Sequence, residues 1–215
     1  MNGVITTENV YEKKDELLKQ INEYKITDAV KSVTNPETRT YGSENHKYKV
    51  ALFDFGYKRN IRNELVNRGC EVIVVPADTT AEQIKEIAPD GIMFSNGPGD
   101  PSENTEVIKN IREIAQLGIP IFGICLGHQL MALAHGATTQ KLKYGHRGAN
   151  QPVIDKALGK TFVTSQNHGY AVVGESMDPE IGEVSHINAN DGTCEGMRYK
   201  NINAFTVQFL SLIHI

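Results

Sequence analysis

The stretch Pro120–Leu130 constrains the fold of this chain more than any other. The apolar run 119–124 predicts a buried strand that ends at Cys125, and residues 126–134 carry apolar side chains at helical spacing. Gly123 and Gly127 flank the cysteine at two residues on either side, which is the spacing of a nucleophile elbow between a strand and a helix. Both positions need glycine because the strand and the helix converge there.

Cys125 has two interpretations. At the start of a helix the dipole favours a thiolate over a thiol, so we expect a reactive nucleophile. The alternative is a buried core cysteine at the end of a parallel strand. The two glycines and the change from strand to helix favour the nucleophile.

Length and composition suit one α/β domain, with 215 residues, of which 40% are hydrophobic and 22% charged. The net charge of −4 gives no reason to expect a nucleic acid or an anionic membrane as partner. No apolar run approaches the ~20 residues of a membrane span. Cys70, Cys125 and Cys194 lie far apart and suggest neither a disulfide framework nor a zinc site, so we expect a reducing, cytoplasmic location and no metal.

The chain changes character near residue 47. Before it lie a plausible surface helix over Val10–Tyr24 and a linker-like segment over Thr34–His46. After it, apolar strands alternate with helices, which predicts an open, mostly parallel, doubly wound α/β sheet covered on both faces. The part that follows the Cys125 helix is β-rich. The expected strands are 50–54, 71–75, 91–94, 119–124, 161–164, 170–173, 183–187, 195–199 and 204–209, and the expected helices are 58–68, 81–88 and 104–117.

Three polar stretches are expected near Cys125, at the carboxyl ends of the strands. In Ser95–Pro101, Gly97 or Gly99 is a candidate oxyanion donor together with the N–H of Leu126, and the alternative is a rigid turn without a ligand. Lys141–Pro152 lacks the spacing of a phosphate-binding loop, and we expect a structured loop near the site or at a subunit contact.

The third stretch, Thr164–Tyr170, is expected as a loop between two strands. Asn167 and the backbone around Gly169 are candidates to hold a polar substrate, whereas His168 is either a base for Cys125 or a histidine that fixes the loop. The other histidines carry less weight. We expect His128 to face its own packing environment, and His135, His146 and His186 have no metal-like partners near them in the sequence.

These stretches resemble the class I glutamine amidotransferase domain and, more narrowly, the small, glutamine-hydrolysing subunit of carbamoyl-phosphate synthase. The elbow and the Gly-Pro-Gly loop are shared across amidotransferases. Three stretches are more specific to this subunit: Phe53–Ile61, the Gly-His-Arg-Gly-Ala-Asn run and the Gln-Asn-His-Gly-Tyr run. The resemblance implies an amidotransferase domain over residues 48–209, preceded by a remnant of the subunit's N-terminal domain plus a linker over 1–47.

The resemblance also implies roles for residues. Cys125 would attack the side-chain amide of glutamine and form a thioester, while the N–H groups of Gly97 and Leu126 hold the oxyanion. No cofactor is implied in this subunit. Ammonia would pass to a large synthetase subunit, which uses ATP. The positions that match glutamine-binding residues of the family are Gln129, Gly99, Asn167, Gly169 and Tyr170.

One departure concerns the base. The family's last strand runs into a His-Pro-Glu motif, whereas here the strand is followed by residues 210–215, which fit no family pattern. His214 has the wrong spacing to replace that histidine, so we expect this chain to hydrolyse glutamine barely or not at all. Two other hypotheses are an amidotransferase domain of another biosynthetic pathway and an inactive pseudo-glutaminase that binds glutamine or a partner.

Overall fold

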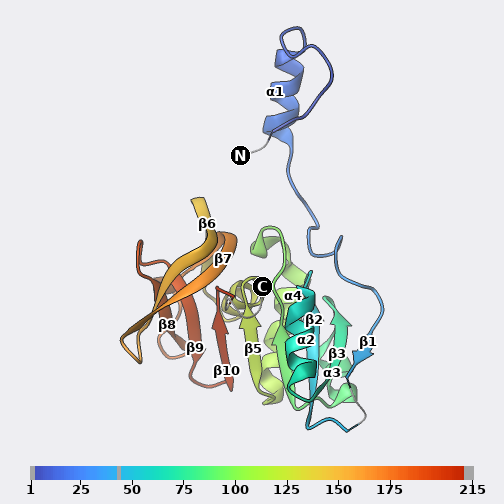
Figure 1. Cartoon of the computed structure of the whole chain (residues 1–215). Coiled ribbons are helices and arrows are strands. Elements are labelled where there is room, and N and C mark those ends of the chain that lie inside the picture. Colours follow the sequence, from blue (N-terminus) through green and yellow to red (C-terminus); the bar gives the residue numbers. More distant parts are fainter. Residues whose placement is uncertain (1–2, 43–44, 211–215) are drawn as a thin grey trace.

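The computed structural model describes residues 3–42 and 45–210, and its centre is a ten-stranded sheet (Figure 1). His214 and the rest of segment 211–215 lie outside the described residues. In chain order the strands are β1 (Arg39–Tyr41), β2 (Tyr48–Asp54), β3 (Cys70–Pro76), β4 (Gly91–Phe94), β5 (Ile121–Ile124), β6 (Thr138–Asp155), β7 (Lys160–Val173), β8 (Gly182–Asn188), β9 (Cys194–Tyr199) and β10 (Ala204–Val207).

Five α-helices are described among these residues. They are α1 (Lys14–Glu23), α2 (Arg59–Asn67), α3 (Ala81–Ile87), α4 (Thr105–Ile114) and α5 (Leu126–Ala134). Short 3₁₀ turns cover Pro101–Glu103, Ala115–Leu117 and Gly174–Ser176. None of the described helices is long and apolar enough to cross a membrane.

The strand order is β1-β3-β2-β4-β5-β10-β9-β8-β6-β7. Strands β3, β2, β4, β5 and β10 pair in parallel, and the remaining pairings are antiparallel, so the whole sheet is mixed. Side chains of α3, α4 and α5 pack in one hydrophobic cluster with the sheet, while Ile61 of α2 belongs to a second cluster. Helices on both faces of a parallel core confirm the predicted α/β class, and the β-rich half extends the sheet on one side (Figure 1).

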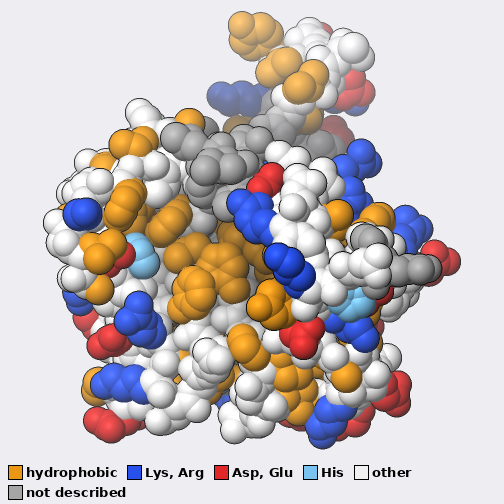
Figure 2. Space-filling model, turned by 60° about the horizontal axis from the view of Figure 1, so that its bottom comes forward, with side chains coloured by type: hydrophobic (Ala, Val, Ile, Leu, Met, Phe, Trp, Pro, Cys, Tyr) orange, Lys and Arg blue, Asp and Glu red, His pale blue; other side chains and the backbone are white. Residues whose placement is uncertain are grey.

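The two faces of the sheet are not equally covered, because an aromatic side chain on one of them is half exposed. Phe122 of β5 and Phe205 of β10 are neighbours in register, with ring centroids 4.7 Å apart, yet Phe205 is 52% exposed. Phe122 packs against the cluster that contains Ile61. Figure 2 shows hydrophobic side chains gathered in the middle of one face of the molecule.

Two predicted loops are strands. Lys141–Pro152 lies within β6 and Thr164–Tyr170 lies within β7, and the two strands form one long antiparallel hairpin. The prediction was wrong because β6 is largely solvent-exposed, with Val153 as its only fully buried side chain, so its sequence is polar rather than alternating. Register shifts between Lys141 and His146 and after Gly148 accommodate the glycines.

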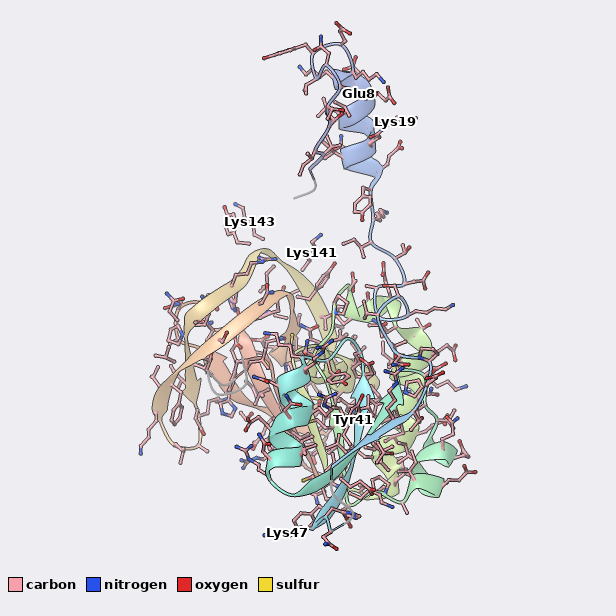
Figure 3. The ribbon with its side chains drawn as sticks, turned by 45° about the vertical axis from the view of Figure 1, so that its right-hand side comes forward. Glu8, Lys19, Tyr41, Lys47, Lys141 and Lys143 are labelled. Carbon is pink, nitrogen blue, oxygen red and sulfur yellow. The ribbon has the colours of Figure 1, made fainter. Side chains whose placement is uncertain are left out.

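The predicted linker is also partly wrong. Arg39–Tyr41 forms β1, which pairs antiparallel with β3 and so belongs to the sheet. Helix α1 is shorter than predicted. Figure 3 shows Glu8 and Lys19 of the α1 region well away from the sheet, with Lys141 and Lys143 at the same end of the molecule. The domain boundary near residue 47 stays a prediction.

Candidate active site

Cys125 lies between β5 and α5 with φ +52° and ψ −103°, a backbone conformation that L-residues rarely adopt. Hydrogen bonds hold this conformation from both sides. The N–H of Cys125 donates to Val207 O at 2.9 Å, and the N–H of Gln129 donates to Cys125 O at 3.1 Å. The strained turn therefore confirms the predicted elbow geometry.

The flanking glycines are required by close approach. A Cβ added to Gly123 would lie 2.8 Å from Thr206 Cγ2, and one added to Gly127 would lie 2.7 Å from the carbonyl carbon of Phe94. The N–H of Gly127 donates to Ser95 O at 3.0 Å, which joins the start of α5 to the end of β4. The converging elements leave no space for a side chain at either position.

Gly97 lies against the residue that follows the nucleophile. A Cβ on Gly97 would meet the Phe55 carbonyl oxygen and would lie 2.6 Å from Leu126 Cδ2. The N–H of Leu126 interacts with the Cys125 sulfur and favours its thiolate form. Gly97 thus packs against the Leu126 side chain and lines the same cavity as Cys125, while the oxyanion role of the Gly97 and Leu126 N–H groups stays a prediction.

The Cys125 thiol is buried, and burial raises its pKa to about 11. The Leu126 N–H, the Lys58 charge and the Gln208 amide each lower this pKa, but together they do not offset the loss of solvation, and the Glu195 carboxylate raises it further. The start of the helix therefore lowers this pKa in the predicted direction, but burial outweighs it and favours the thiol.

We expect alkylation of Cys125 by iodoacetamide to accelerate about tenfold per pH unit from pH 7 to 10, because a raised pKa keeps the sulfur protonated throughout that range. Lys58→Met removes a charge that favours the thiolate, so it slows alkylation at each pH. Peptide mass spectrometry measures the rate at Cys125. Lys85→Met in α3 is the matched control, and a rate plateau below pH 9 would contradict the raised pKa.

A cavity of about 530 Å³ opens beside Cys125. Three of its lining residues, Gly97, Cys125 and Asn167, were predicted to be site residues. Val33, Lys58 and Leu210 were not. Val33 precedes the sheet in the chain, and nothing in its sequence context indicated a place at the site. The full lining is Val33, Gly56, Tyr57, Lys58, Asn96, Gly97, Pro98, Cys125, Asn167 and Leu210.

Gln129 lies in α5, four residues after Cys125, and its side chain is buried. Its Nε2 donates to Tyr170 O at 2.7 Å and to Gln208 Oε1 at 2.8 Å, so it ties α5 to β7 and to the residue after β10. The sequence analysis did not identify Gln208, whose side-chain amide lowers the pKa of Cys125.

The remaining predicted residues, Gly99, Gly169 and Tyr170, do not line the cavity beside Cys125. Tyr170 lines a second cavity of about 410 Å³ with Asp100 and Lys141. Gly99 has φ +90° and packs against Ala29, with the Ala29 Cβ 2.6 Å from where a Cβ on Gly99 would lie. Gly169 lies between Asn167 and Tyr170 on β7 and has space around its Cα.

None of the histidines among the described residues hydrogen-bonds to the Cys125 sulfur. Both ring nitrogens of His168 contact oxygen atoms of β7: Nδ1 lies 2.8 Å from Tyr170 O, and Nε2 lies 3.0 Å from Gln166 Oε1. Burial lowers the pKa of His168 to about 4. His168 fixes its own strand. His128 is fully buried, contacts Thr206 Oγ1 at 2.8 Å, and has a pKa lowered to about 3 by burial, so it faces its own packing environment as predicted.

His146 does have carboxylate partners, contrary to the sequence-based expectation. Its Nδ1 lies 3.1 Å from Glu195 Oε1 and its Nε2 lies 2.8 Å from Asp191 Oδ2. Glu195 is fully buried, and burial raises its pKa to about 7. No local sequence pattern signals these contacts, because the partners are 45 and 49 residues away along the chain.

Known proteins share both the sequence and the fold of this site. Residues 51–209 match the family glutamine amidotransferase class-I. Proteins named carbamoyl phosphate synthase small chain are 51% identical over 193 residues in Bacillus cereus, covering 90% of this chain and 52% of the relative, and 50% identical over 199 residues in Staphylococcus epidermidis, covering 91% and 54%. The chain therefore spans about half the length of the curated relatives it matches.

Solved structures agree on the fold. The crystal structure of a putative GMP synthase component from Thermoplasma acidophilum superposes with a TM-score of 0.67 at 21% identity, over 76% of this chain and 84% of the other. A glutamine amidotransferase from Thermotoga maritima gives a TM-score of 0.59 at 16% identity, over 77% and 76%. The family match covers β3 to β10, most of β2, the elbow and the Gly-Pro-Gly turn, and the chain belongs to the class-I glutamine amidotransferase family.

Proposed function

We propose that this chain is the glutamine-hydrolysing part of a carbamoyl-phosphate synthase small chain. The observation that carries the chemistry is Cys125 at a strained elbow, with the Leu126 N–H at its sulfur and Gly97 lining the same cavity. The narrower identity rests on the relatives of that name, which are about half identical to this chain.

The proposed reaction begins with attack of the Cys125 sulfur on the side-chain amide carbon of glutamine. The carbonyl oxygen gains negative charge, which N–H groups of Gly97 and Leu126 stabilise. The carbon–nitrogen bond then breaks, and the amide nitrogen leaves as ammonia with the proton that the thiol has lost. Water hydrolyses the thioester to glutamate and restores the thiol. No cofactor is needed for these steps.

Glutamine would occupy the cavity beside Cys125. Asn167 lines it, and Gly169 and Tyr170 follow Asn167 on β7. Gln129 supports this strand through Tyr170 O, so we propose that it positions the pocket in addition to any contact with glutamine. Gly99 would shape the turn that carries Gly97, since it packs on Ala29 with a positive φ.

Removal of the proton from the Cys125 thiol is the step that the described residues support least. A thiol with a pKa of about 11 needs a base, and the histidines among the described residues are bonded elsewhere. We therefore expect only slow hydrolysis of glutamine from the part of the chain that the structure describes, residues 3–42 and 45–210. Removing the base from a cysteine or serine hydrolase typically costs several orders of magnitude in rate.

The proposed partner is a large synthetase subunit that consumes the ammonia, as the relatives' designation as a small chain suggests. We also propose a cytoplasmic location, because all three cysteines are free thiols.

Glutamate release from glutamine tests the proposed activity. We expect a slow release that Cys125→Ala abolishes and Cys194→Ala retains, since Cys194 is buried in β9 with a pKa raised to about 12. Adding a large synthetase subunit from one of the relatives' organisms tests the partner. Release that is equal in Cys125→Ala would contradict the proposed nucleophile.

A further inference from the structure

Four side-chain atoms that accept hydrogen bonds converge between β6, β7 and β9. Glu195 Oε1 lies 3.1 Å from His146 Nδ1 and 4.0 Å from His168 Nε2. Gln166 Oε1 lies 3.0 Å from His168 Nε2. Glu195 is fully buried and His168 is nearly so, whereas one edge of His146 reaches the solvent. We refer to His146, His168 and Glu195 as the buried triad.

The outer nitrogen of each imidazole is already committed as a donor. The carbonyl oxygen of Tyr170 can only accept, so His168 Nδ1 carries the proton of that 2.8 Å contact. A carboxylate oxygen such as Asp191 Oδ2 also accepts hydrogen bonds. His146 Nε2 therefore carries the proton of its 2.8 Å contact with Asp191. In the neutral form of each ring, the inner nitrogen is then a bare lone pair.

These lone pairs face oxygens that are also acceptors. Glu195 Oε1 has no proton to give when ionised. The orientation of the Gln166 amide is fixed, because its Nε2 donates to Glu195 Oε2 at 3.0 Å and to Thr164 Oγ1 at 3.2 Å. With Glu195 ionised, the two inner ring nitrogens and the two oxygens that face them are all acceptors, an arrangement that one divalent cation satisfies.

We propose that His146 Nδ1, His168 Nε2 and Glu195 Oε1 bind one divalent transition-metal ion of the zinc type, with Gln166 Oε1 beside it. Two imidazoles and a carboxylate are a donor set that zinc accepts in proteins, and donors around a tetrahedral zinc ion are about 3.3 Å apart. The three donor atoms lie within 4.8 Å of one another, so binding needs only a modest contraction.

The surroundings match a metal site as well. Zinc-binding histidines almost always donate their other N–H to a carboxylate or a backbone carbonyl, and here Asp191 and Tyr170 O supply one of each. The bound ion would fasten the β6–β7 hairpin to β9. This hairpin carries Asn167 and Tyr170, so the ion would hold that wall of the Cys125 cavity in place.

Equilibrium dialysis of the chelator-treated chain against Zn²⁺ tests the site, followed by the absorption spectrum with Co²⁺ in its place. We expect one ion per chain and a spectrum without a thiolate charge-transfer band. His168→Gln and Glu195→Gln should remove binding, and excess Mg²⁺ should not compete. His186→Gln is the matched control, because His186 faces Asp155 outside the triad.

Asp191→Asn provides a variant that leaves the buried triad intact, since Asp191 is 47% exposed. It should weaken Zn²⁺ binding about 10- to 100-fold without loss of the folded circular-dichroism spectrum. The proposal is overturned if the wild-type chain takes up no Zn²⁺, if Asp191→Asn binds as tightly as wild type, or if the Co²⁺ spectrum shows thiolate ligation.

Discussion

Replacing Cys125 with alanine is expected to reduce covalent labelling by a glutamine-mimicking chloroketone to background. The electrophile places its reactive carbon where the glutamine amide carbon would lie, and Cys125 is the only cysteine that lines the cavity of about 530 Å³. Intact-mass spectrometry measures the labelled fraction over time. Because the pKa of the sulfur is raised, labelling of the wild-type chain should be faster at pH 9 than at pH 7.

Two controls make the labelling experiment specific. Cys194→Ala should label like the wild type, since Cys194 lies buried in β9 beside Met197. Glutamine in excess should protect Cys125, whereas asparagine, which is one methylene shorter, should protect less. Equal labelling of Cys125→Ala and wild type would show that the reagent reacts elsewhere and would remove the support for the elbow as a glutamine site.

Gly127→Ala is expected to lower the free energy of unfolding by about 2–4 kcal/mol. The added methyl group would lie 2.7 Å from the Phe94 carbonyl carbon and 2.7 Å from Phe94 Cβ, so β4 and α5 must move apart. That movement also strains the hydrogen bond from Gly127 N to Ser95 O. Urea denaturation followed by circular dichroism measures the change.

The matched control is Gly91→Ala at the start of β4. Its nearest neighbour would be Pro120 O at 3.8 Å, which is ordinary contact, and its backbone does not need a positive φ. We expect a change within about 0.5 kcal/mol, as for most substitutions that create no clash. Similar losses for both variants would mean that the elbow is not closely packed against β4.

The elbow and the parallel strands could be predicted from the sequence because their signals are local. The apolar runs of β3, β4 and β5 and the paired glycines around Cys125 each occupy a few consecutive residues. The helix expected over 81–88 also has a local signal, since Thr80 forms a capping box with Gln83 at the start of α3. Such features depend little on what the rest of the chain does.

The other features depend on distant parts of the chain. The β6–β7 hairpin has the composition of a loop because half of the β6 side chains are exposed and β7 buries the polar residues Thr164, Gln166 and His168. The contacts of His146 join residues 45 and 49 positions apart. The net shift of the Cys125 pKa could not be predicted, because the desolvation that raises it comes from the assembled fold and exceeds the local effect of the helix terminus.

Cys125 is the residue that we propose forms a thioester with glutamine. The most direct measurement is the intact mass of the chain after incubation with glutamine and an acid quench, followed by peptide mapping. We predict an adduct of one glutamyl group on the peptide that contains Cys125, lost on treatment with hydroxylamine and absent from Cys125→Ala. Glutamate release without such an adduct, or an adduct at Cys70 or Cys194, would contradict the claim.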